Sequence, residues 1–417
     1  MKKFYAVITA LLFVQLASAQ VLIDCGDNRY DEEVFASIDT TNDVVYGANL
    51  NNQGVNTILT MDIYQPSGDT AAFRPLIVWV HGGSFVGGSK VDNDVVGLCQ
   101  HFAKRGYVCV SINYRLGITF PFNQANATSA VFRGVQDMKA AVRFFRQDAA
   151  TANTYRIDPD MIFGGGSSAG AFCALHLAYL DQPSELPSTI DTTVLGGMEG
   201  NSGNPGYPST IRAVLNLCGA MGDTAWMLPG DEPVCSMHGT SDDVVPYNTA
   251  MLYLLGTFQI MVVSGSYSVN EHAMLIGNEQ SMYTYHGSEH VPYSSSAAYM
   301  DTTVRFVSNF LYRQMGCTPR NPVPVANTWN TVSVGEMQSI NSSVNVFPNP
   351  ATNQFVVEGS LFRENSRVEI CNTLGEKIYA SEFNKQITID SKKFPKGIYF
   401  VRVSDSQNQL TEKLVIE

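Results

Sequence analysis

The stretch of sequence that decides the fold is Met161-Ile-Phe-Gly-Gly-Gly-Ser-Ser-Ala-Gly170. Its first three residues form a short apolar run that predicts a strand, and residues 171–179 behind it are compatible with a helix. The chain therefore passes from strand to helix through a turn of glycine, serine and alanine. A serine on such a sharp turn has a strained backbone and crowded neighbours, so the residues two positions before and after it must be small.

Two serines compete for the exposed position of this turn. Gly166 and Gly170 provide the small neighbours around Ser168, whereas Ser167 is flanked less favourably, by a glycine and Ala169. A glycine-rich turn can also be purely structural. The position between a strand and a helix nevertheless favours a nucleophile for acyl transfer, and we expect it to be Ser168.

Acyl transfer also needs hydrogen-bond donors for the oxyanion. The apolar run 75–80 predicts a buried strand that leads directly into His81-Gly-Gly-Ser-Phe85. Glycine lets a backbone approach a substrate carbonyl closely, so we expect the N–H groups of Gly82, Gly83 and Ala169 to form the oxyanion hole. The histidine that begins this motif is interpreted as bracing the loop.

A carboxylate that orients the base is expected after a later strand, residues 233–237. Catalytic groups of an open parallel sheet gather at the carboxyl ends of its strands. The loop His238-Gly-Thr-Ser-Asp-Asp-Val-Val-Pro246 offers Asp242 and Asp243 at that edge. Two adjacent carboxylates cannot both point inward, and we favour Asp242 over Asp243.

The base is expected after the last strand of this region, residues 283–285. His290 lies in the following loop, and His286 is the alternative nearer the strand. We favour His290, which completes the chain order Ser, Asp, His of a catalytic triad. Three further histidines lack such a context and are interpreted as structural: His101, His176 and His272.

The sequence around these motifs predicts an α/β fold. Short apolar strands alternate with helical stretches from about residue 44 to 317. Residues 75–80 and 107–112 are nearly continuous apolar runs, typical of central parallel strands. Residues 131–145 carry apolar positions at helical spacing. An edge-proximal antiparallel strand is predicted from the alternating Leu59, Met61 and Ile63.

A second, smaller domain is predicted at the C-terminal end. Residues 318–343 are rich in Pro, Asn, Ser and Thr and read as a linker. From residue 344 to 417 helix signals vanish, and short strands predict a small β-sandwich. Six strands are expected: 354–358, 367–370, 377–381, 386–390, 398–404 and 410–417.

Residues 44–300 resemble the carboxylesterase branch of the α/β-hydrolase superfamily. The resemblance rests on the motifs at 81–85, 166–170 and 238–246 together with Asn113-Tyr-Arg-Leu-Gly117. It implies a mostly parallel central sheet flanked by helices and a Ser–His–Asp esterase that needs no cofactor. Where that family often has Glu before the serine, this chain has Ser167. The segment 199–206 has no counterpart and is either a lid or pocket loop or a surface excursion.

Residues 344–417 resemble the sorting domain of the type IX secretion system of Bacteroidetes. The matching pieces are Val346-Phe-Pro-Asn-Pro350, Gly397-Ile-Tyr-Phe-Val-Arg-Val403 and the terminal Glu412-Lys-Leu-Val-Ile-Glu417. The resemblance implies passage through the type IX machinery to the cell surface or medium. A carbohydrate-binding module is the alternative, and it would need exposed aromatic residues on one sheet face. We expect Phe355, Ile398 and Phe400 to be core instead.

Composition and the N-terminal end agree with export. Residues 1–19 have a positive start, an apolar stretch and a small-residue cleavage site, which predicts a signal peptide with Gln20 as the mature start. That apolar stretch is too short for a stable transmembrane insertion. The net charge of −12 argues against nucleic acid or an anionic membrane as a partner. Among the eight cysteines no spacing suggests zinc, and Cys25 and Cys317 are candidates for a disulfide that brackets residues 20–317.

Three functions are compatible with these motifs. A secreted carboxylic ester hydrolase is favoured, with acetyl or feruloyl esters of polysaccharides as substrates suggested by analogy only. A peptidase of the prolyl-oligopeptidase type shares the triad, but its β-propeller has no place before residue 44. A non-catalytic binding protein on the same scaffold is disfavoured by the complete set of catalytic residue types.

Overall fold

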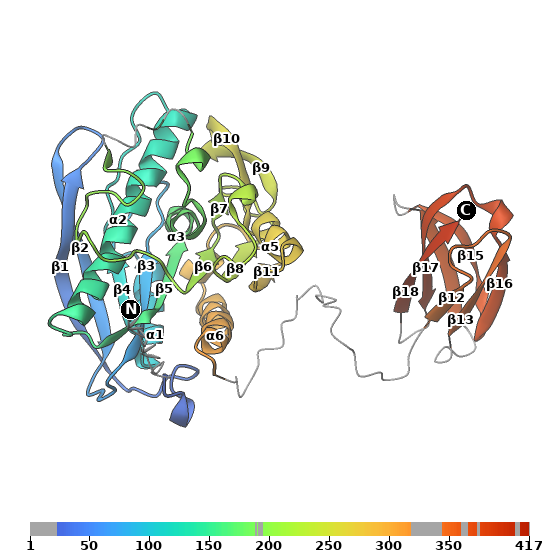
Figure 1. Cartoon of the computed structure of the whole chain (residues 1–417), viewed down its shortest axis with the longest axis horizontal. Coiled ribbons are helices and arrows are strands. Elements are labelled where there is room, and N and C mark those ends of the chain that lie inside the picture. The colour runs from blue at the N-terminus through green and yellow to red at the C-terminus, as the bar shows by residue number, and fades with distance from the viewer. Residues whose placement is uncertain are drawn as a thin grey trace, which may run out of the picture. The chain divides into compact units, whose positions relative to one another are not determined.

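The computed structural model divides the chain into two compact units, Met1–Thr331 and Val332–Glu417, drawn in Figure 1. The boundary falls inside the predicted linker, 318–343, which lies outside the described residues, as does the predicted signal peptide. The structure describes residues 23–187, 190, 195–317, 344–359, 366–372, 376–404 and 409–416.

Strands and helices alternate along the first unit, as predicted. Its strands are β1 (Ile38–Leu50), β2 (Asn56–Pro66), β3 (Arg74–Val80), β4 (Val108–Ile112), β5 (Ile157–Ser167), β6 (Ala213–Leu217), β7 (Ala220–Met221), β8 (Val234–Gly239), β9 (Thr249–Leu254), β10 (Phe258–Gly265) and β11 (Gln280–Tyr285). Its α-helices are α1 (Asn93–Lys104), α2 (Gln124–Ala150), α3 (Ala169–Tyr179), α5 (Ser266–Leu275) and α6 (Ala297–Gln314). None of these described helices has the length and apolar content that a membrane crossing requires.

Eight of these strands form one sheet in the order β1-β2-β4-β3-β5-β6-β8-β11. The pairs from β4 to β11 are parallel, and β2 pairs antiparallel with β1 and with β4. Helices α2, α3 and α5 pack on one face of this sheet and α1 and α6 on the other (Figure 1). The fold is therefore the α/β-hydrolase fold that the sequence predicts.

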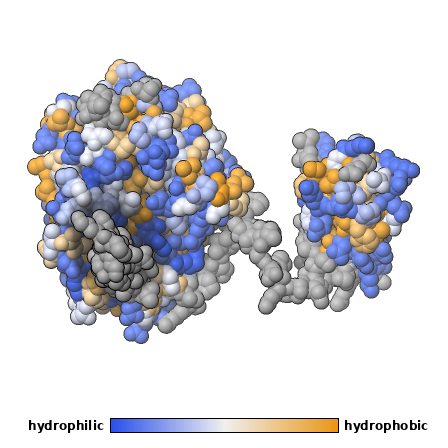
Figure 2. Space-filling view, viewed as in Figure 1, coloured by the Kyte–Doolittle hydropathy of each residue, from blue (hydrophilic) through white to orange (hydrophobic). Residues whose placement is uncertain are grey.

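Burial follows the predicted strand patterns. All residues of β3 and β4 are buried, because both faces of these central strands are covered by helices. Leu59, Met61 and Ile63 are buried in β2, one strand from the sheet edge. Both layers of the core lie beneath a surface on which hydrophilic and hydrophobic residues are intermixed (Figure 2).

Helix α2 confirms the helix predicted at 131–145, but it is longer, with 27 residues. The Asn123 side chain caps its start by accepting a hydrogen bond from the backbone N–H of Asn126. Its apolar face packs on the sheet as expected. Its polar face is also buried, which the helical spacing does not reveal, and the buried polar residues there are Arg133, Gln136, Asp137, Lys139 and Arg143.

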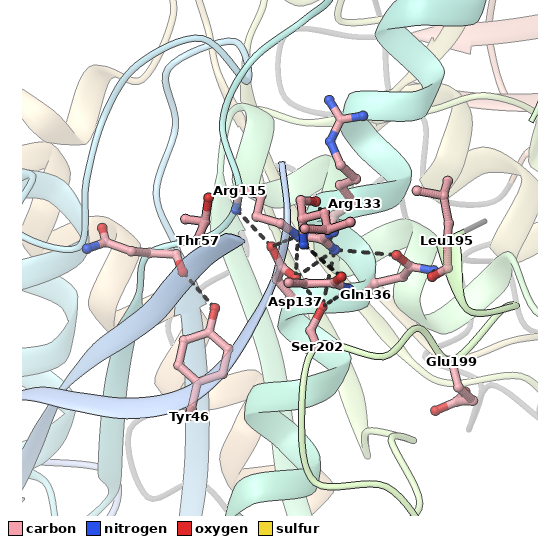
Figure 3. Close-up of polar contacts among 12 residues, drawn as sticks. Tyr46, Thr57, Arg115, Arg133, Gln136, Asp137, Leu195, Glu199 and Ser202 are labelled. Atoms are coloured by element: carbon pink, nitrogen blue, oxygen red, sulfur yellow. Dashed lines mark hydrogen bonds and ion pairs between the residues drawn. The ribbon is translucent and has the colours of Figure 1, made fainter. Parts of the chain in front are cut away.

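An ion pair between Asp137 and Arg115 lies at the centre of this polar face (Figure 3). The Arg115 Nε donates to Asp137 at 2.9 Å, and the Arg115 backbone N–H donates to the same carboxylate at 2.8 Å. The Ser202 hydroxyl adds a third hydrogen bond at 2.6 Å. The side chains of Arg115 and Asp137 are 1% and 0% exposed, so the pair is removed from water and satisfied by its own neighbours.

The segment 199–206, left open by the sequence, packs against this same face. Ser202 reaches Asp137, and Glu199 forms ion pairs of 3.0 Å with Lys139 and Arg143. The Ser202 carbonyl also accepts a hydrogen bond from the backbone N–H of Ala48 in β1. These contacts tie the segment to α2 and β1.

The predicted pairing of Cys25 with Cys317 is confirmed, since a disulfide joins them with their Cα atoms 6.2 Å apart. The disulfide connects the chain before β1 to the end of α6. Cys109 and Cys218 lie in apolar strand-like runs of the sequence and are buried as small core residues, whereas Cys371, in a similar run, is only half-buried.

The second unit consists of two antiparallel sheets, β12-β13-β16 and β15-β14-β17-β18, that enclose one core. The strands are β12 (Val344–Phe347), β13 (Gln354–Gly359), β14 (Ser366–Asn372), β15 (Lys377–Phe383), β16 (Gln386–Asp390), β17 (Gly397–Ser404) and β18 (Gln409–Ile416). All six predicted strands are present, and β12 was not among them. The small β-sandwich is thus confirmed.

One prediction about this core is wrong. Phe355 is buried, but Ile398 and Phe400 are 43% and 42% exposed. Side chains alternate along a strand, and in β17 the inward positions belong to Tyr399 and Val401. Two apolar residues of β17 therefore face outward, a choice that hydrophobicity alone does not reveal.

We expect Asp137→Asn to lower the free energy of unfolding by about 3–5 kcal/mol, because it leaves the Arg115 guanidinium buried without its counter-charge. Urea unfolding followed by tryptophan fluorescence measures the change. Asp301→Asn is the matched control, since Asp301 pairs with Arg305 at 3.8 Å on the exposed side of α6. That change should cost under about 1 kcal/mol. Equal effects of the two substitutions would contradict the role given to the buried pair.

Candidate active site

Ser168 occupies the sharp turn between β5 and α3. Its φ of +52° and ψ of −117° lie outside the regions that side-chain-bearing residues favour. Its backbone N–H donates to the Leu217 carbonyl at the end of β6, at 2.9 Å, which fixes the turn to the neighbouring strand. The hydroxyl of Ser168 is thereby presented at the carboxyl edge of the sheet.

The two glycines predicted to permit this turn are sterically required. A Cβ atom on Gly166 would lie 2.1 Å from the backbone carbon of Gly170. A Cβ atom on Gly170 would lie 1.9 Å from the carbonyl oxygen of Val80 at the end of β3. No side chain fits at either position, so the turn and β3 approach each other as closely as their backbones allow.

Ser167, the alternative nucleophile, points elsewhere. It is buried, and its hydroxyl shares a hydrogen bond of 2.8 Å with the hydroxyl of Tyr293. The Tyr293 hydroxyl also contacts the Leu217 carbonyl at 3.4 Å. The structure thus gives Ser167 a partner that the sequence left undefined.

His290 lies between Ser168 and Asp242. Its Nε2 is 2.8 Å from the Ser168 Oγ, and its Nδ1 is 2.6 Å from the Asp242 Oδ2. An ionised carboxylate can only accept, so Nδ1 carries the proton and Nε2 accepts from the serine hydroxyl. The structure brings together the three residues that the sequence put forward for a triad.

The rejected alternatives lie outside this chain of hydrogen bonds. Asp243 and His286 are exposed, and His286 follows directly after β11. Asp242, by contrast, has a side chain that is 0% exposed. Its Oδ1 accepts the backbone N–H groups of Val244 and Val245 at 2.9 and 2.8 Å, so the loop after β8 closes around this carboxylate.

His238 is a contributor that the sequence reasoning missed. We expected it in a loop, but it belongs to β8, is buried, and its Nε2 lies 3.0 Å from the Asp242 Oδ2. Burial alone would raise the pKa of Asp242. Hydrogen bonds from His238 and His290, joined by that from the Val245 backbone, outweigh burial and hold the pKa of Asp242 well below its usual range. In the sequence His238 lies only four residues before Asp242, and this proximity was the signal that could have indicated their contact.

The glycine loop expected to hold the oxyanion lies against the serine. A Cβ atom on Gly82 would be 3.3 Å from the Cβ of Ser168. Gly83 has a φ of +104°, and a Cβ atom there would lie 2.2 Å from the Gly87 carbonyl oxygen. His81 is buried, its Nδ1 donates to the Gly82 carbonyl at 2.7 Å, and its ring stacks on Tyr114. That packing supports the interpretation of His81 as a brace.

A metal ion is a poor occupant of this site. Cys218, Asp242 and His290 offer ligand-type atoms within 4.8 Å of one another. The facing atoms of Asp242 and His290 are already joined by their hydrogen bond. Burial raises the pKa of the Cys218 thiol to about 12, so a thiolate ligand is not available near neutral pH.

A cavity of about 70 Å³ opens beside Ser168 and has an apolar lining. Helices α2 and α3, the loop after β8 and the β9–β10 hairpin contribute its walls. Its residues near the serine are Ser84, Phe85, Ala169, Phe172, Val244 and Val245. An ester could therefore place its carbonyl at Ser168 and an apolar substituent in this cavity.

Two families match the chain. Residues 61–226 match BD-FAE, a range that includes Gly82, Gly83 and Ser168 and ends before Asp242 and His290. Residues 345–417 match the secretion system C-terminal sorting domain.

The chain is also similar to curated and solved esterases. Carboxylesterase 3B of Mus musculus is 35% identical over 120 residues, 28% of this chain and 20% of that protein. Gut esterase 1 of Caenorhabditis briggsae is 24% identical over 213 residues, 50% of this chain and 36% of that protein. The chain thus spans well under half the length of these relatives.

Among solved structures, esterase 2 of Thermogutta terrifontis phosphorylated by paraoxon is 23% identical with a TM-score of 0.47. That match covers 69% of this chain and 97% of the other. The chain therefore has the α/β-hydrolase fold with a match to BD-FAE over residues 61–226, followed by a match to the secretion system C-terminal sorting domain over residues 345–417.

Proposed function

We propose that this protein is a serine carboxylic ester hydrolase that works through an acyl-enzyme on Ser168. The supporting observation is the continuous hydrogen-bond chain from the Ser168 Oγ through His290 to Asp242, with links of 2.8 and 2.6 Å. A chain of this kind lets a neutral imidazole take a proton from the serine hydroxyl while a carboxylate stabilises the resulting imidazolium.

Acylation follows from this arrangement. The Ser168 Oγ attacks the ester carbonyl carbon as its proton passes to His290 Nε2, and the carbonyl oxygen becomes an oxyanion. The backbone N–H groups of Gly82, Gly83 and Ala169 are proposed to stabilise that oxyanion. When the intermediate collapses, the bond to the alcohol oxygen breaks, and His290 returns the proton to the departing alcohol.

Deacylation repeats the same proton transfers with water. His290 takes a proton from a water molecule as its oxygen attacks the acyl carbon, and then protonates Ser168 as the acid departs. Throughout both steps Asp242 stays ionised, because the hydrogen bonds from His238 and His290 favour its charged form. The tautomer of His290 that can accept the serine proton is thereby maintained.

The sorting domain indicates secretion or display at the cell surface, and we propose the type IX machinery as its partner. A signal peptide over residues 1–19 would supply the first export step. Export together with the BD-FAE match leads us to propose ester groups on polysaccharides outside the cell as natural substrates. The polysaccharide assignment rests on analogy with the family.

Ser168→Ala should reduce kcat for p-nitrophenyl acetate by at least about 10⁴-fold, because it removes the hydroxyl that is hydrogen-bonded to His290. Ser167→Ala is the matched control. It removes the neighbouring hydroxyl, whose partner is Tyr293 rather than His290, and should retain activity within about tenfold. If Ser168→Ala cleaves the ester as fast as the wild type, the proposed mechanism is wrong. Turnover of a peptide amide panel at comparable rates would favour a peptidase instead.

Asp242→Asn should reduce kcat by about 10³–10⁴-fold, since an amide at this position favours the tautomer of His290 that cannot accept the serine proton. Asp243→Asn changes the adjacent, exposed carboxyl and should leave kcat within about twofold of the wild type. Steady-state kinetics at pH 7.5 measure both. A larger loss in Asp243→Asn than in Asp242→Asn would reverse the assignment of the acid.

A further inference from the structure

A chain of buried polar side chains continues from Asp242 into the interior. Asn216 in β6, His238 in β8 and Ser266 at the start of α5 are each 0% exposed. The Asn216 amide donates to the Ser266 hydroxyl at 2.9 Å, and that hydroxyl lies 2.7 Å from His238 Nδ1. His238 Nε2 in turn lies 3.0 Å from the Asp242 Oδ2. We call Asn216, Ser266 and His238 the buried triplet.

The neighbours of His238 place a proton on its Nε2. The Asp242 carboxylate and, at 3.1 Å, the Val245 carbonyl face this nitrogen, and both can only accept. The Ser266 hydroxyl can donate to Nδ1 or to the Gly219 carbonyl at 3.1 Å. In the first case His238 is neutral with its proton on Nε2, and in the second Nδ1 carries a proton as well. Nε2 therefore donates to Asp242 in either arrangement.

The Oδ2 atom of Asp242 is shared between two histidines. It lies 2.6 Å from His290 Nδ1 and 3.0 Å from His238 Nε2. The other carboxylate oxygen is already held by two backbone N–H groups of the loop after β8. A donor from His238 withdraws negative charge from the oxygen that faces His290. It thereby weakens the attraction of that oxygen for a positively charged imidazole.

The start of α5 is built against the loop that carries Asp242. A Cβ atom on Gly265, the residue before Ser266, would lie 1.8 Å from the Pro246 carbonyl oxygen. The two segments therefore approach as closely as their backbones allow. Ser266 has a fixed place beside this loop, and its hydroxyl holds the ring of His238 in one orientation.

The other titratable groups around the two histidines are neutral or exposed. The Cys218 sulfur lies within 4.8 Å of the ligand-type atoms of Asp242 and His290, and burial raises the pKa of this thiol to about 12. The Tyr247 ring meets His238 edge to face at 5.7 Å, and burial raises the pKa of Tyr247. The surrounding elements also carry two buried phenols, whose pKa burial raises, and two exposed carboxyls: Tyr285, Tyr293, Asp243 and Glu289.

We propose that His238, oriented by Ser266 and Asn216, is a positioning residue that controls the protonation of the base through Asp242. The proposal rests on the ester hydrolase function proposed above and adds a residue to its mechanism. Because His238 shares Oδ2 with His290, it fixes the carboxylate and limits its attraction for the protonated base. His290 is then neutral, and able to accept the serine proton, at a lower pH than a carboxylate bound to His290 alone permits.

Two amide substitutions separate the contact with Asp242 from the contact with Ser266. The side-chain nitrogen of glutamine is as many covalent bonds from Cα as the histidine Nε2, so His238→Gln can still donate to Asp242. The side-chain nitrogen of asparagine is as many bonds from Cα as the histidine Nδ1, so His238→Asn reaches Ser266 but not Asp242. His272→Asn is the control, since His272 bonds to the Met227 carbonyl at 3.3 Å near the end of α5.

The pH dependence of kcat/KM for p-nitrophenyl acetate measures the effect. In His238→Asn the acid limb should move up by about 0.5–1 pH unit, because the carboxylate then attracts the protonated base more strongly. In His238→Gln and His272→Asn the limb should stay within about 0.3 unit of the wild type. An acid limb that stays in place or moves down in His238→Asn would overturn the proposal. Equal shifts in the asparagine and glutamine variants would overturn it as well.

Ser266→Ala tests the same role without changing His238. It removes the hydroxyl that orients the imidazole, and the acid limb should move in the same direction as in His238→Asn. Ser264→Ala is its control, because Ser264 is also buried but shares its hydrogen bond of 3.3 Å with Thr249. An acid limb that is unchanged in Ser266→Ala, or shifted equally in Ser264→Ala, would contradict the role of the buried triplet.

Proton NMR separates this proposal from the esterase function itself. The proton shared by His290 Nδ1 and Asp242 gives a low-field resonance that needs no turnover. That resonance should move to lower field in His238→Asn and stay in place in His238→Gln. This pattern in a protein that hydrolyses no ester would uphold the positioning role and refute the function. Hydrolysis that depends on Ser168, with resonance and acid limb unchanged in His238→Asn, would refute the positioning role and leave the function standing.

Discussion

The site depends on one steric constraint, the contact of three backbones around Ser168. Gly166, Gly170 and the end of β3 at Val80 approach so closely that no Cβ atom fits between them. This contact forces the chain to reverse from β5 into α3 within one residue, and Ser168 takes the positive φ that results. The same contact places the loop after β3, with Gly82 and Gly83, directly beside the serine.

The proposed acid and base, Asp242 and His290, reach this point because the strands that precede them are parallel. β8 and β11 pair in register, His238 opposite Thr284 and Gly239 opposite Tyr285, so both strands end at the same level. Their following loops carry Asp242 and His290 toward the serine from the same edge. The Nε2 of His238, which lies within β8, is 3.0 Å from the Asp242 Oδ2. The proposed triad is thus spread over three loops but fixed by strands that share one register.

Much of this arrangement could be predicted from the sequence, because the requirements were local. The sequence shows a glycine two residues on either side of Ser168. It also shows a carboxylate and a histidine shortly after later strands. Each of these patterns lies within a short stretch of the chain. The His290 partner of Asp242 was predicted in this way, but its second contact, His238, was missed, and so was the Tyr293 partner of Ser167. Tyr293 is 126 residues from Ser167, and only the fold shows that they meet.

Two other features of the chain could not be predicted from hydrophobicity, the burial of the polar face of α2 and the exposure of two apolar residues in β17. The apolar spacing of α2 predicted only the face that packs on the sheet, and it did not show that the polar face is covered by the segment 199–206 through Glu199 and Ser202. Ile398 and Phe400 are apolar yet exposed, because the pleat of β17 turns their positions outward. Hydrophobicity predicts which residues can be buried, and the register of the strand decides which of them are.

Helix α3 carries Ser168 at its start and part of the apolar wall beside it. Ser168 caps this helix, and Phe172 and His176 follow at intervals of four residues, which places all three along one side of it. His176 is held at both ring nitrogens, within α3 and from the segment after β7. Ser168, Phe172 and His176 therefore belong to one rigid element, and their separations cannot change without unwinding the helix. Phe172 also lines the cavity beside Ser168, so the helix that presents the hydroxyl also fixes one wall of the space in which an ester would lie.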